Sequence, residues 1–162
     1  MQTPASIAKH PIHPMLIVFP IGLWVFSFIC DVVFKMVSTP VWNDVAFYTM
    51  AGGLVGALLA ALPGFIDMLA LREREPRRIA WTHMALNLVA VALYALNLYL
   101  RTHYDAGAML PFVLSLLGVC LLGVSGWLGG ELAYVHRVGV QPALQPVREA
   151  PHDMAERMRR IV

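Results

Sequence analysis

Charged side chains are scarce in this sequence: Asp, Glu, Lys and Arg make up only 14% of its 162 residues, whereas 59% are hydrophobic. Soluble domains average about 25% charged residues, so an ordinary soluble globular domain is excluded. The small net charge of +2 gives no indication of a nucleic-acid-binding surface. The apolar residues are concentrated in stretches of about 20 residues, the length that crosses a bilayer. The composition therefore predicts an integral membrane protein surrounded by lipid.

Cysteine and catalytic motifs are equally scarce. The two cysteines, Cys30 and Cys120, both fall inside apolar segments. Because they lie at different depths, we expect them to pack as small apolar side chains and to form no disulfide. No nucleophile–base pairing, phosphate-binding loop, zinc-finger spacing or nucleic-acid motif is present. A signal-peptide pattern is also missing, so we expect the first apolar segment to be retained. The sequence assigns no catalytic residue, and any enzymatic role would be that of an electron-transfer component.

Four apolar segments predict an all-α fold, an integral membrane four-helix bundle. The spans are expected at about residues 14–36, 47–71, 80–100 and 108–135. They divide the chain into an N-terminal segment (1–13), a transmembrane domain (14–136) and a polar tail (137–162). No repeat is evident at a fixed period. Glycines four residues apart, at Gly52 and Gly56 and at Gly126 and Gly130, could let helices or a second copy approach closely.

The basic residues predict the orientation of the bundle. Ten of the twelve Lys and Arg residues lie in the N-terminal segment, the loop after the second span and the tail. Basic residues are enriched on the cytoplasmic side of a membrane, and an even number of spans places these three regions together. We therefore predict that both termini are cytoplasmic.

Three spans carry a face of polar or small residues when each is rolled at 100° per residue. On the first span this face comprises His13, Ile17, Pro20, Trp24 and Ser27. On the second it comprises Gly53, Ala57, Ala60, Gly64 and Asp67, and on the third His83, Asn87, Tyr94 and Asn97. Because an asparagine facing lipid is costly, we expect these faces to close on one another inside the bundle.

Five ionisable residues are predicted to lie in one layer at the cytoplasmic side: His13, Asp67, His83, Glu131 and His136. Ionisable groups at the edge of hydrocarbon are expensive, so their convergence indicates a functional site. Imidazole is the commonest metal ligand and carboxylates complete many such sites, so the five could hold a divalent metal. Alternatively, two of His13, His83 and His136 could hold a haem b iron axially, with Asn87 and Tyr94 as supporting partners. Asp31 and His103 belong to the opposite side.

Other interpretations remain open at this point. Glu131 and His136 lie about 140° apart on the fourth helix, so at most one can point straight inward. His13 precedes a proline, which is ordinary at a helix start and needs no ligand. Asp67 and the polar face of the third span could instead form a proton or ion path. A structural or partner-binding subunit without a cofactor would also carry these charges.

Several short motifs resemble the bacterial membrane family called domain of unknown function 2231 (DUF2231). These are His10-Pro-Ile-His-Pro14, Phe19-Pro-Ile-Gly22, Ala61-Leu-Pro-Gly-Phe-Ile-Asp67, His83-Met-Ala-Leu-Asn87, and Gly126-Trp-Leu-Gly-Gly130 through Tyr134 and His136. The resemblance covers roughly residues 9–140 and implies four spans in a bacterial inner (plasma) membrane. It also favours electron transfer, because some members are joined to Rieske-type iron–sulfur modules. This chain lacks the Cys-His pairs of such a cluster, so a Rieske-like partner would be a separate protein, and a quinone is the other expected partner.

Overall fold

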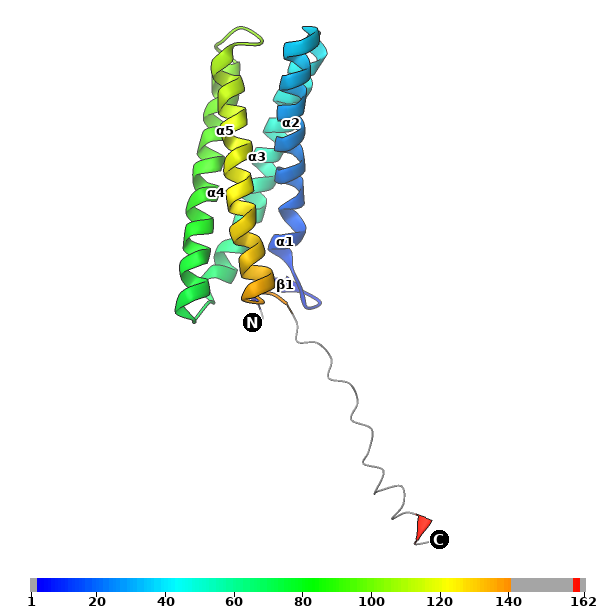
Figure 1. The fold of residues 1–162 in the computed structure, drawn as a ribbon, viewed down its shortest axis with the longest axis vertical. Helices are drawn as coiled ribbons and strands as arrows, with labels where there is room; N and C mark the ends of the chain where they lie inside the picture. The colour runs from blue at the N-terminus through cyan, green and yellow to red at the C-terminus, as the bar shows by residue number, and fades with distance from the viewer. Residues whose placement is uncertain (1–2, 141–158, 161–162) are drawn as a thin grey trace.

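The computed structural model of the protein describes residues 3–140 and 159–160. These residues form a short β-hairpin followed by a bundle of long helices (Figure 1). The elements are β1 (Ser6–Ile7), β2 (His10–Pro11), α1 (Ile12–Leu16), α2 (Val18–Val37), α3 (Pro40–Leu69), α4 (Arg74–Arg101), α5 (Met109–Gly130) and the π-helix η1 (Glu131–Val135). Most of the predicted polar tail lies outside the described residues.

Four helical segments of the described chain are long and apolar enough to cross a membrane, which confirms the predicted all-α, four-span fold. They are Ile12–Val37, Pro40–Leu69, Arg74–Arg101 and Met109–Val135. Helix α3 begins at Pro40 and helix α4 at Arg74, both earlier than the predicted spans. Proline suits the first position of a helix, and Arg and Glu are good helix formers, so both helices extend beyond their apolar residues.

The first span is divided between α1 and α2 at Ile17. Pro20 has no N–H to donate to the carbonyl of Leu16, one turn earlier, and its ring crowds that carbonyl. The last span also changes its geometry, because α5 continues into η1, where the N–H of His136 donates to the carbonyl of Glu131 at 3.1 Å. Both irregular segments lie at the end of the bundle that carries the N-terminus, called here the proximal end (Figure 1).

A β-hairpin at the N-terminus was not predicted. Strands β1 and β2 pair antiparallel, with Ser6 opposite Pro11 and Ile7 opposite His10. The two turn residues, Ala8 and Lys9, both have positive φ, 49° and 67°. This is the backbone of a type I′ turn, which normally signals itself by Asn-Gly or a similar pair. The sequence Ala-Lys gives no such signal, so its turn chemistry does not predict the hairpin.

The helices pack as two hairpins that lie side by side (Figure 1). Helices α1 and α2 pack on α3, which forms the first hairpin, and α4 packs on α5, which forms the second. Contacts of α3 with α4 and of α2 with α5 join the two hairpins. Helices α2 and α4 run in the same direction and are diagonal partners in an up-down-up-down bundle. Their inward side chains meet at the centre.

The two hairpins are internal repeats of each other. Side chains of the first span meet those found 70 residues later on α4: the His13 and His83 ring centres are 6.3 Å apart, Trp24 and Tyr94 stack at 4.0 Å, and Asp31 accepts from Arg101 at 2.5 Å. The second helices of the two hairpins, α3 and α5, also match each other. Their equivalent positions are 65 residues apart in the sequence. The matched pairs are Ala46 with Pro111, Gly53 with Gly118, Ala60 with Ser125, and Gly64 with Gly129.

The matched residues of the two hairpins also make matching hydrogen bonds. His13 bonds the carbonyl of Ala60 and His83 that of Ser125. Likewise, Ser27 donates to the carbonyl of Ala46 and Asn97 to that of Pro111, so each bond has a counterpart in the other hairpin. The separation changes from 70 to 65 because 15 positions lead from Asp31 to Ala46 and only 10 from Arg101 to Pro111, and for this reason no repeat was evident at a fixed period. Repeats that run in the same direction are related by an axis along the membrane normal, and membrane proteins of this kind often place their sites at the repeat interface.

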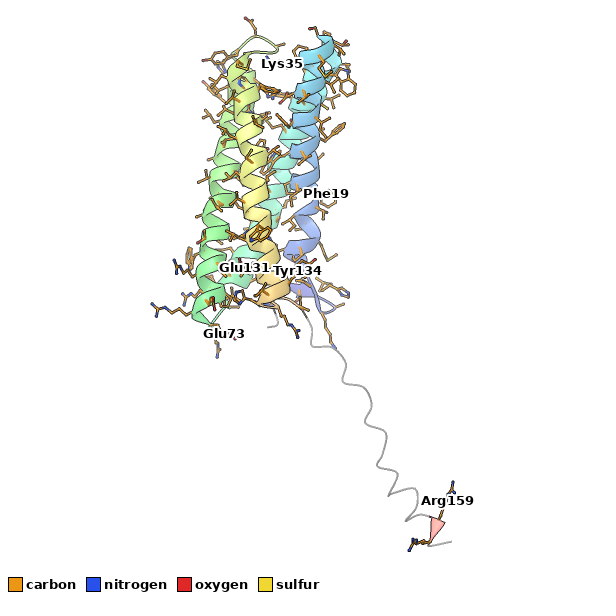
Figure 2. All side chains as sticks on the ribbon, viewed as in Figure 1. Phe19, Lys35, Glu73, Glu131, Tyr134 and Arg159 are labelled. Atoms are coloured by element: carbon orange, nitrogen blue, oxygen red, sulfur yellow. The ribbon has the colours of Figure 1, made fainter. Side chains whose placement is uncertain are left out.

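The inward faces predicted for the first three spans are buried or half-buried throughout. Trp24, Met50, Ala90 and Tyr94 form the central core, with Tyr94 fully buried. Large apolar side chains such as Phe19 instead cover the outside of the bundle (Figure 2). This distribution is the one expected of a bundle whose outer surface meets lipid.

We predict that Gly118→Ala destabilises the bundle, because an added Cβ would lie 2.5 Å from Cζ of Tyr94, whose ring is fixed against Trp24. Overpacking of this kind costs about 1–3 kcal/mol, which thermal unfolding in detergent would detect as a lower Tm. Gly123→Ala on the same helix is the matched control, since an added Cβ there meets nothing within 4 Å. Equal stability of the two variants would contradict the packing described at the centre.

Candidate functional site

The five residues predicted to form one ionisable layer all lie at the proximal end, but they do not assemble into one metal site. Within the described chain there is no group of three or more His, Cys, Asp or Glu side chains placed to hold a metal ion. The predicted divalent-metal set of His13, Asp67, His83, Glu131 and His136 is therefore not brought together. What the structure does bring together is the pair His13 and His83.

His13 projects from α1 toward α3. Its Nδ1 lies 2.8 Å from the carbonyl oxygen of Ala60, which only accepts, so Nδ1 carries the proton. A Cβ added at Gly64 would lie 2.6 Å from the same nitrogen, so the ring fits against α3 only because position 64 is glycine. Nε2 of His13 has no hydrogen-bond partner among the described residues. It is also not fully buried, because Tyr94 Oη is the one unpaired atom of that kind in the described chain. This nitrogen keeps a lone pair beside accessible space.

His83 projects from α4 toward α5 in the equivalent way. Its Nδ1 lies 2.9 Å from the carbonyl oxygen of Ser125, and the ring packs near Gly129, where an added Cβ would be 3.2 Å from Cε1. Unlike in His13, the other nitrogen is engaged, because Asn87 Nδ2 donates to Nε2 at 3.0 Å. His83 is thus a neutral imidazole with one donor and one acceptor nitrogen, both used.

The two imidazoles face each other between the hairpins. Their ring centres are 6.3 Å apart and their planes are nearly perpendicular, at 88°. Each ring is oriented by a carbonyl of its own hairpin. A histidine ligand of a metal almost always donates its other ring N–H to a carbonyl or carboxylate, which fixes the tautomer and the direction of the ring. Each ring is therefore fixed in its tautomer and direction by a carbonyl of its own hairpin.

Asp67 anchors the N-terminal segment. Its Oδ1 accepts from the backbone N–H of Ala5 at 2.8 Å, which ties the segment before β1 to the end of α3. Glu131 and His136 are half-buried at the end of the fourth span, and their side chains make no hydrogen bond or ion pair within the described residues. Figure 2 shows Glu131 beside the exposed Tyr134. The geometry assigns no ligand role to these three residues.

Tyr94 was predicted as a supporting partner of the histidines, and this prediction is wrong. Eleven residues of helix separate it from His83, a rise of about 16 Å. Tyr94 instead stacks on Trp24 at the centre of the bundle, with an interplanar angle of 13°. Its hydroxyl oxygen is the one fully buried side-chain polar atom in the described chain without a partner. Asn87, the other predicted partner, does contact His83.

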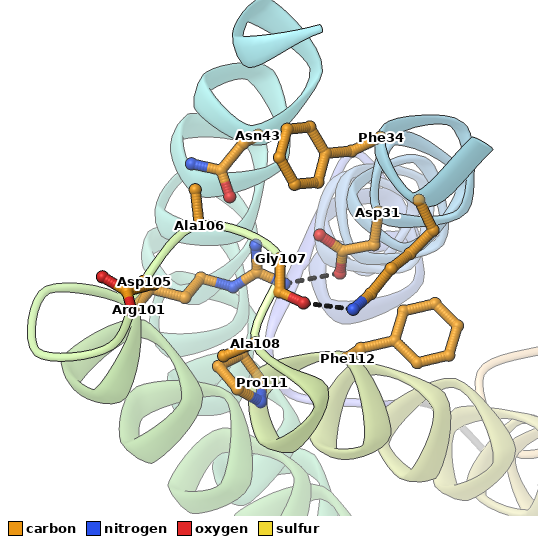
Figure 3. A pocket seen from close by; sticks show the side chains of 11 residues that line it. Asp31, Phe34, Asn43, Arg101, Asp105, Ala106, Gly107, Ala108, Pro111 and Phe112 are labelled. Carbon is orange, nitrogen blue, oxygen red and sulfur yellow. Dashed lines mark hydrogen bonds and ion pairs between the residues drawn. The ribbon is translucent and has the colours of Figure 1, made fainter. Parts of the chain in front are cut away.

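A polar network at the opposite, distal end was not predicted from the sequence (Figure 3). Arg101 and Asp31 form a buried ion pair, and each side chain keeps only 7% of its surface exposed. Ser115 donates to Asp31 at 2.8 Å, while Asn97 donates to Ser115 at 2.9 Å and to the Pro111 carbonyl. The sequence did carry a signal for this network. Asp31 is an acid inside the first apolar segment, and Arg101 is one of only two basic residues predicted on that side.

The network lies beneath the loop between α4 and α5. Lys35 donates to the carbonyl of Gly107 in this loop, and the loop and Phe112 cover a cavity of about 20 Å³ (Figure 3). A cavity of that size holds about one water molecule. The distal end is therefore a polar structural contact between the two hairpins.

A family model described as a predicted membrane protein, DUF2231, matches residues 9–142. The match confirms the resemblance noted in the sequence and includes both hairpins. No curated protein and no solved structure shows a significant match to the chain.

We predict that Arg101→Met costs about 3–5 kcal/mol of stability, because it leaves the Asp31 carboxylate buried without a counter-ion. The double variant Asp31→Asn with Arg101→Met removes both charges and should recover most of the loss. Thermal unfolding in detergent compares the two, with Lys35→Met as a control for removal of a nearby exposed cation. If the double variant is no more stable than Arg101→Met, the network does not depend on charge pairing.

Proposed function

Because the chain belongs to the DUF2231 family of predicted membrane proteins, we propose that it is an electron-transfer subunit of a bacterial inner membrane. In this proposal His13 and His83 hold one haem b between the two hairpins. The observation that carries it is the pair of equivalent imidazoles, each oriented by a backbone carbonyl of its own hairpin and separated by 6.3 Å.

The separation of the rings suits two ligands of one ion. An imidazole nitrogen lies about 2.0 Å from a metal that it binds and about 1.1 Å from its own ring centre, so two opposed imidazoles on one ion need centres about 6 Å apart. The observed distance is 6.3 Å. The Nδ1 atoms face the carbonyls of Ala60 and Ser125, so Nε2 is the nitrogen that would coordinate, and in His83 it would first have to release its hydrogen bond from Asn87.

The number of ligands favours haem over a bare divalent metal. Structural and catalytic zinc sites take three or four protein ligands, whereas the porphyrin of a haem supplies four nitrogens and needs only axial ligands from the protein. The described residues place two histidine rings 6.3 Å apart and bring no third potential ligand to them. When bound, the haem would supply reversible one-electron chemistry. The protein's own residues hold and orient it, and Gly64 and Gly129 leave room for the two rings.

The proposed orientation has the proximal end in the cytoplasm. In the described chain that end carries Lys9, the loop cations Arg72, Arg74, Arg77 and Arg78, and Arg137. Cytoplasmic loops of membrane proteins carry such an excess of Lys and Arg. The histidine pair would then lie near the cytoplasmic face, where a quinone or a separate Rieske-like redox protein could exchange electrons with it. Without a cofactor, the same hydrogen bonds would give His13 and His83 a structural role, in which His13 joins α1 to α3 and His83 joins α4 to α5.

We predict that the protein, produced with haem precursor and purified in detergent, shows the Soret and α bands of a low-spin, bis-imidazole haem at one haem per chain. His13→Ala and His83→Ala should each abolish the low-spin spectrum, and the double variant should lose the haem. Absorption spectra and a pyridine haemochrome assay measure both.

The control variants separate ligation from general damage. His103→Ala removes an exposed imidazole at the distal end, and Asp67→Ala removes the anchor of the N-terminal segment, so both should retain the haem spectrum. A wild-type protein that folds and contains no haem under these conditions would contradict the proposed function. Haem loss in the Asp67 variant equal to that in the histidine variants would argue against a specific role of the pair.

A further inference from the structure

One outward face of α4 carries three arginines at the proximal end. When α4 is rolled at 100° per residue, Arg74, Arg77 and Arg78 fall on the same side as Trp81 and Tyr99, within an arc of about 100°. All five side chains are exposed. We call Arg74, Arg77 and Arg78 the arginine stripe.

The two aromatic residues of this face mark the thickness of a membrane. Eighteen residues of helix lead from Trp81 to Tyr99, a rise of about 27 Å. The hydrocarbon core of a bilayer is about 30 Å thick, and Trp and Tyr are enriched at its two edges. Between them this face is apolar, and Leu88 and Leu96 are 59% and 50% exposed. This side of α4 therefore meets lipid, with Trp81 at the proximal edge of the hydrocarbon.

The arginine stripe lies at the level of the lipid phosphates. Along the helix axis, Arg78 and Arg77 are about 4.5 and 6 Å beyond Trp81, and Arg74 is about 10 Å beyond it. The headgroup layer extends about 5–8 Å beyond the hydrocarbon on each side. Arg74 can also reach this layer, because a long arginine side chain can lie along the helix surface. The stripe thus faces lipid headgroups at the end of the bundle where Glu73 lies (Figure 2).

The guanidinium groups of the stripe are available to a ligand. Within the described residues none of the three makes a hydrogen bond or an ion pair. Glu73 and Glu75 flank the stripe in the sequence, yet they form no ion pair with it. All three cations are arginines, and the planar guanidinium group binds phosphate through two parallel hydrogen bonds. The chemistry of the stripe therefore matches a phosphate group.

We propose that the arginine stripe binds an anionic phospholipid, whose phosphate contacts the guanidinium groups while its acyl chains lie along Trp81 and Leu88. A zwitterionic lipid fits less well, because its ammonium group opposes the attraction of its phosphate to arginine. The enrichment of cations on one side of a membrane does not require that three of them share the lipid-facing side of one helix. A soluble acidic partner would not reach the acyl chains beside Trp81. Such a lipid site does not depend on the proposed function.

The test uses the full chain reconstituted in phosphatidylcholine vesicles that contain a small share of phosphatidylglycerol with brominated acyl chains. Bromine quenches nearby tryptophan fluorescence, and a Trp81→Phe variant provides the signal of the other three tryptophans for subtraction. Brominated phosphatidylglycerol should quench Trp81 more than the same share of brominated phosphatidylcholine. The combined variant Arg74→Gln, Arg77→Gln and Arg78→Gln should lower the relative binding constant at least about tenfold, since one basic residue near an anionic surface contributes about fivefold.

The matched control changes three exposed arginines outside α4, namely Arg137, Arg159 and Arg160, to glutamine and should keep the preference for phosphatidylglycerol. If the combined stripe variant does not fold, Arg77→Gln alone should lower the constant about fivefold. Equal losses in stripe and control variants would reduce the effect to general charge attraction and overturn the site. Equal quenching of the wild type by the two brominated lipids would also overturn it. Full reversal of the preference by millimolar inorganic phosphate would show a site for the free anion instead of a lipid.

Discussion

Polar side chains inside a bilayer must find their partners within the protein, and this constraint determines how the two hairpins meet. Three side chains of the first span and three of α4 point at one another across the centre: two imidazoles, two stacked aromatic rings, and an acid with a base. The imidazoles and the charged pair could not face lipid at low cost. Their mutual contacts replace the hydrophobic driving force that holds helices together in water and that is missing among lipid tails.

The repeat explains why, at each of three heights along the bundle, a residue of the first span contacts its equivalent on α4. Two similar hairpins related by an axis along the bundle place equivalent residues opposite each other, so a histidine on one hairpin meets a histidine on the other. Where the hairpins have diverged, the contacts become asymmetric. Asp31 faces Arg101. The first hairpin therefore pairs more favourably with the second than with another copy of itself, which would place two like charges opposite each other. Asn87 in place of an apolar residue makes the two imidazoles unequal.

The pattern of apolar and polar residues predicted the four spans, from the length of the apolar segments, and the inward faces, from the positions of the polar residues at 100° per residue. It also placed His13, Asp67 and His83 at one end. It could not show that Asp67 bonds the backbone of Ala5, since the β-hairpin has a turn sequence without glycine or asparagine. The ion pair of Asp31 and Arg101 was not predicted. The sequence indicates how deep each residue lies in the membrane, but it does not show which residue each one contacts. The repeat was hidden because its spacing changes from the first helix to the second.

The proposed function requires that His13 and His83 would together hold one haem. Their ring planes are nearly perpendicular, at 88°. Low-temperature electron paramagnetic resonance of the oxidised, haem-loaded protein tests this most directly. The account predicts a low-spin ferric signal of the strongly anisotropic kind that perpendicular axial imidazoles give. A high-spin signal, or a protein that folds without binding haem, would contradict it.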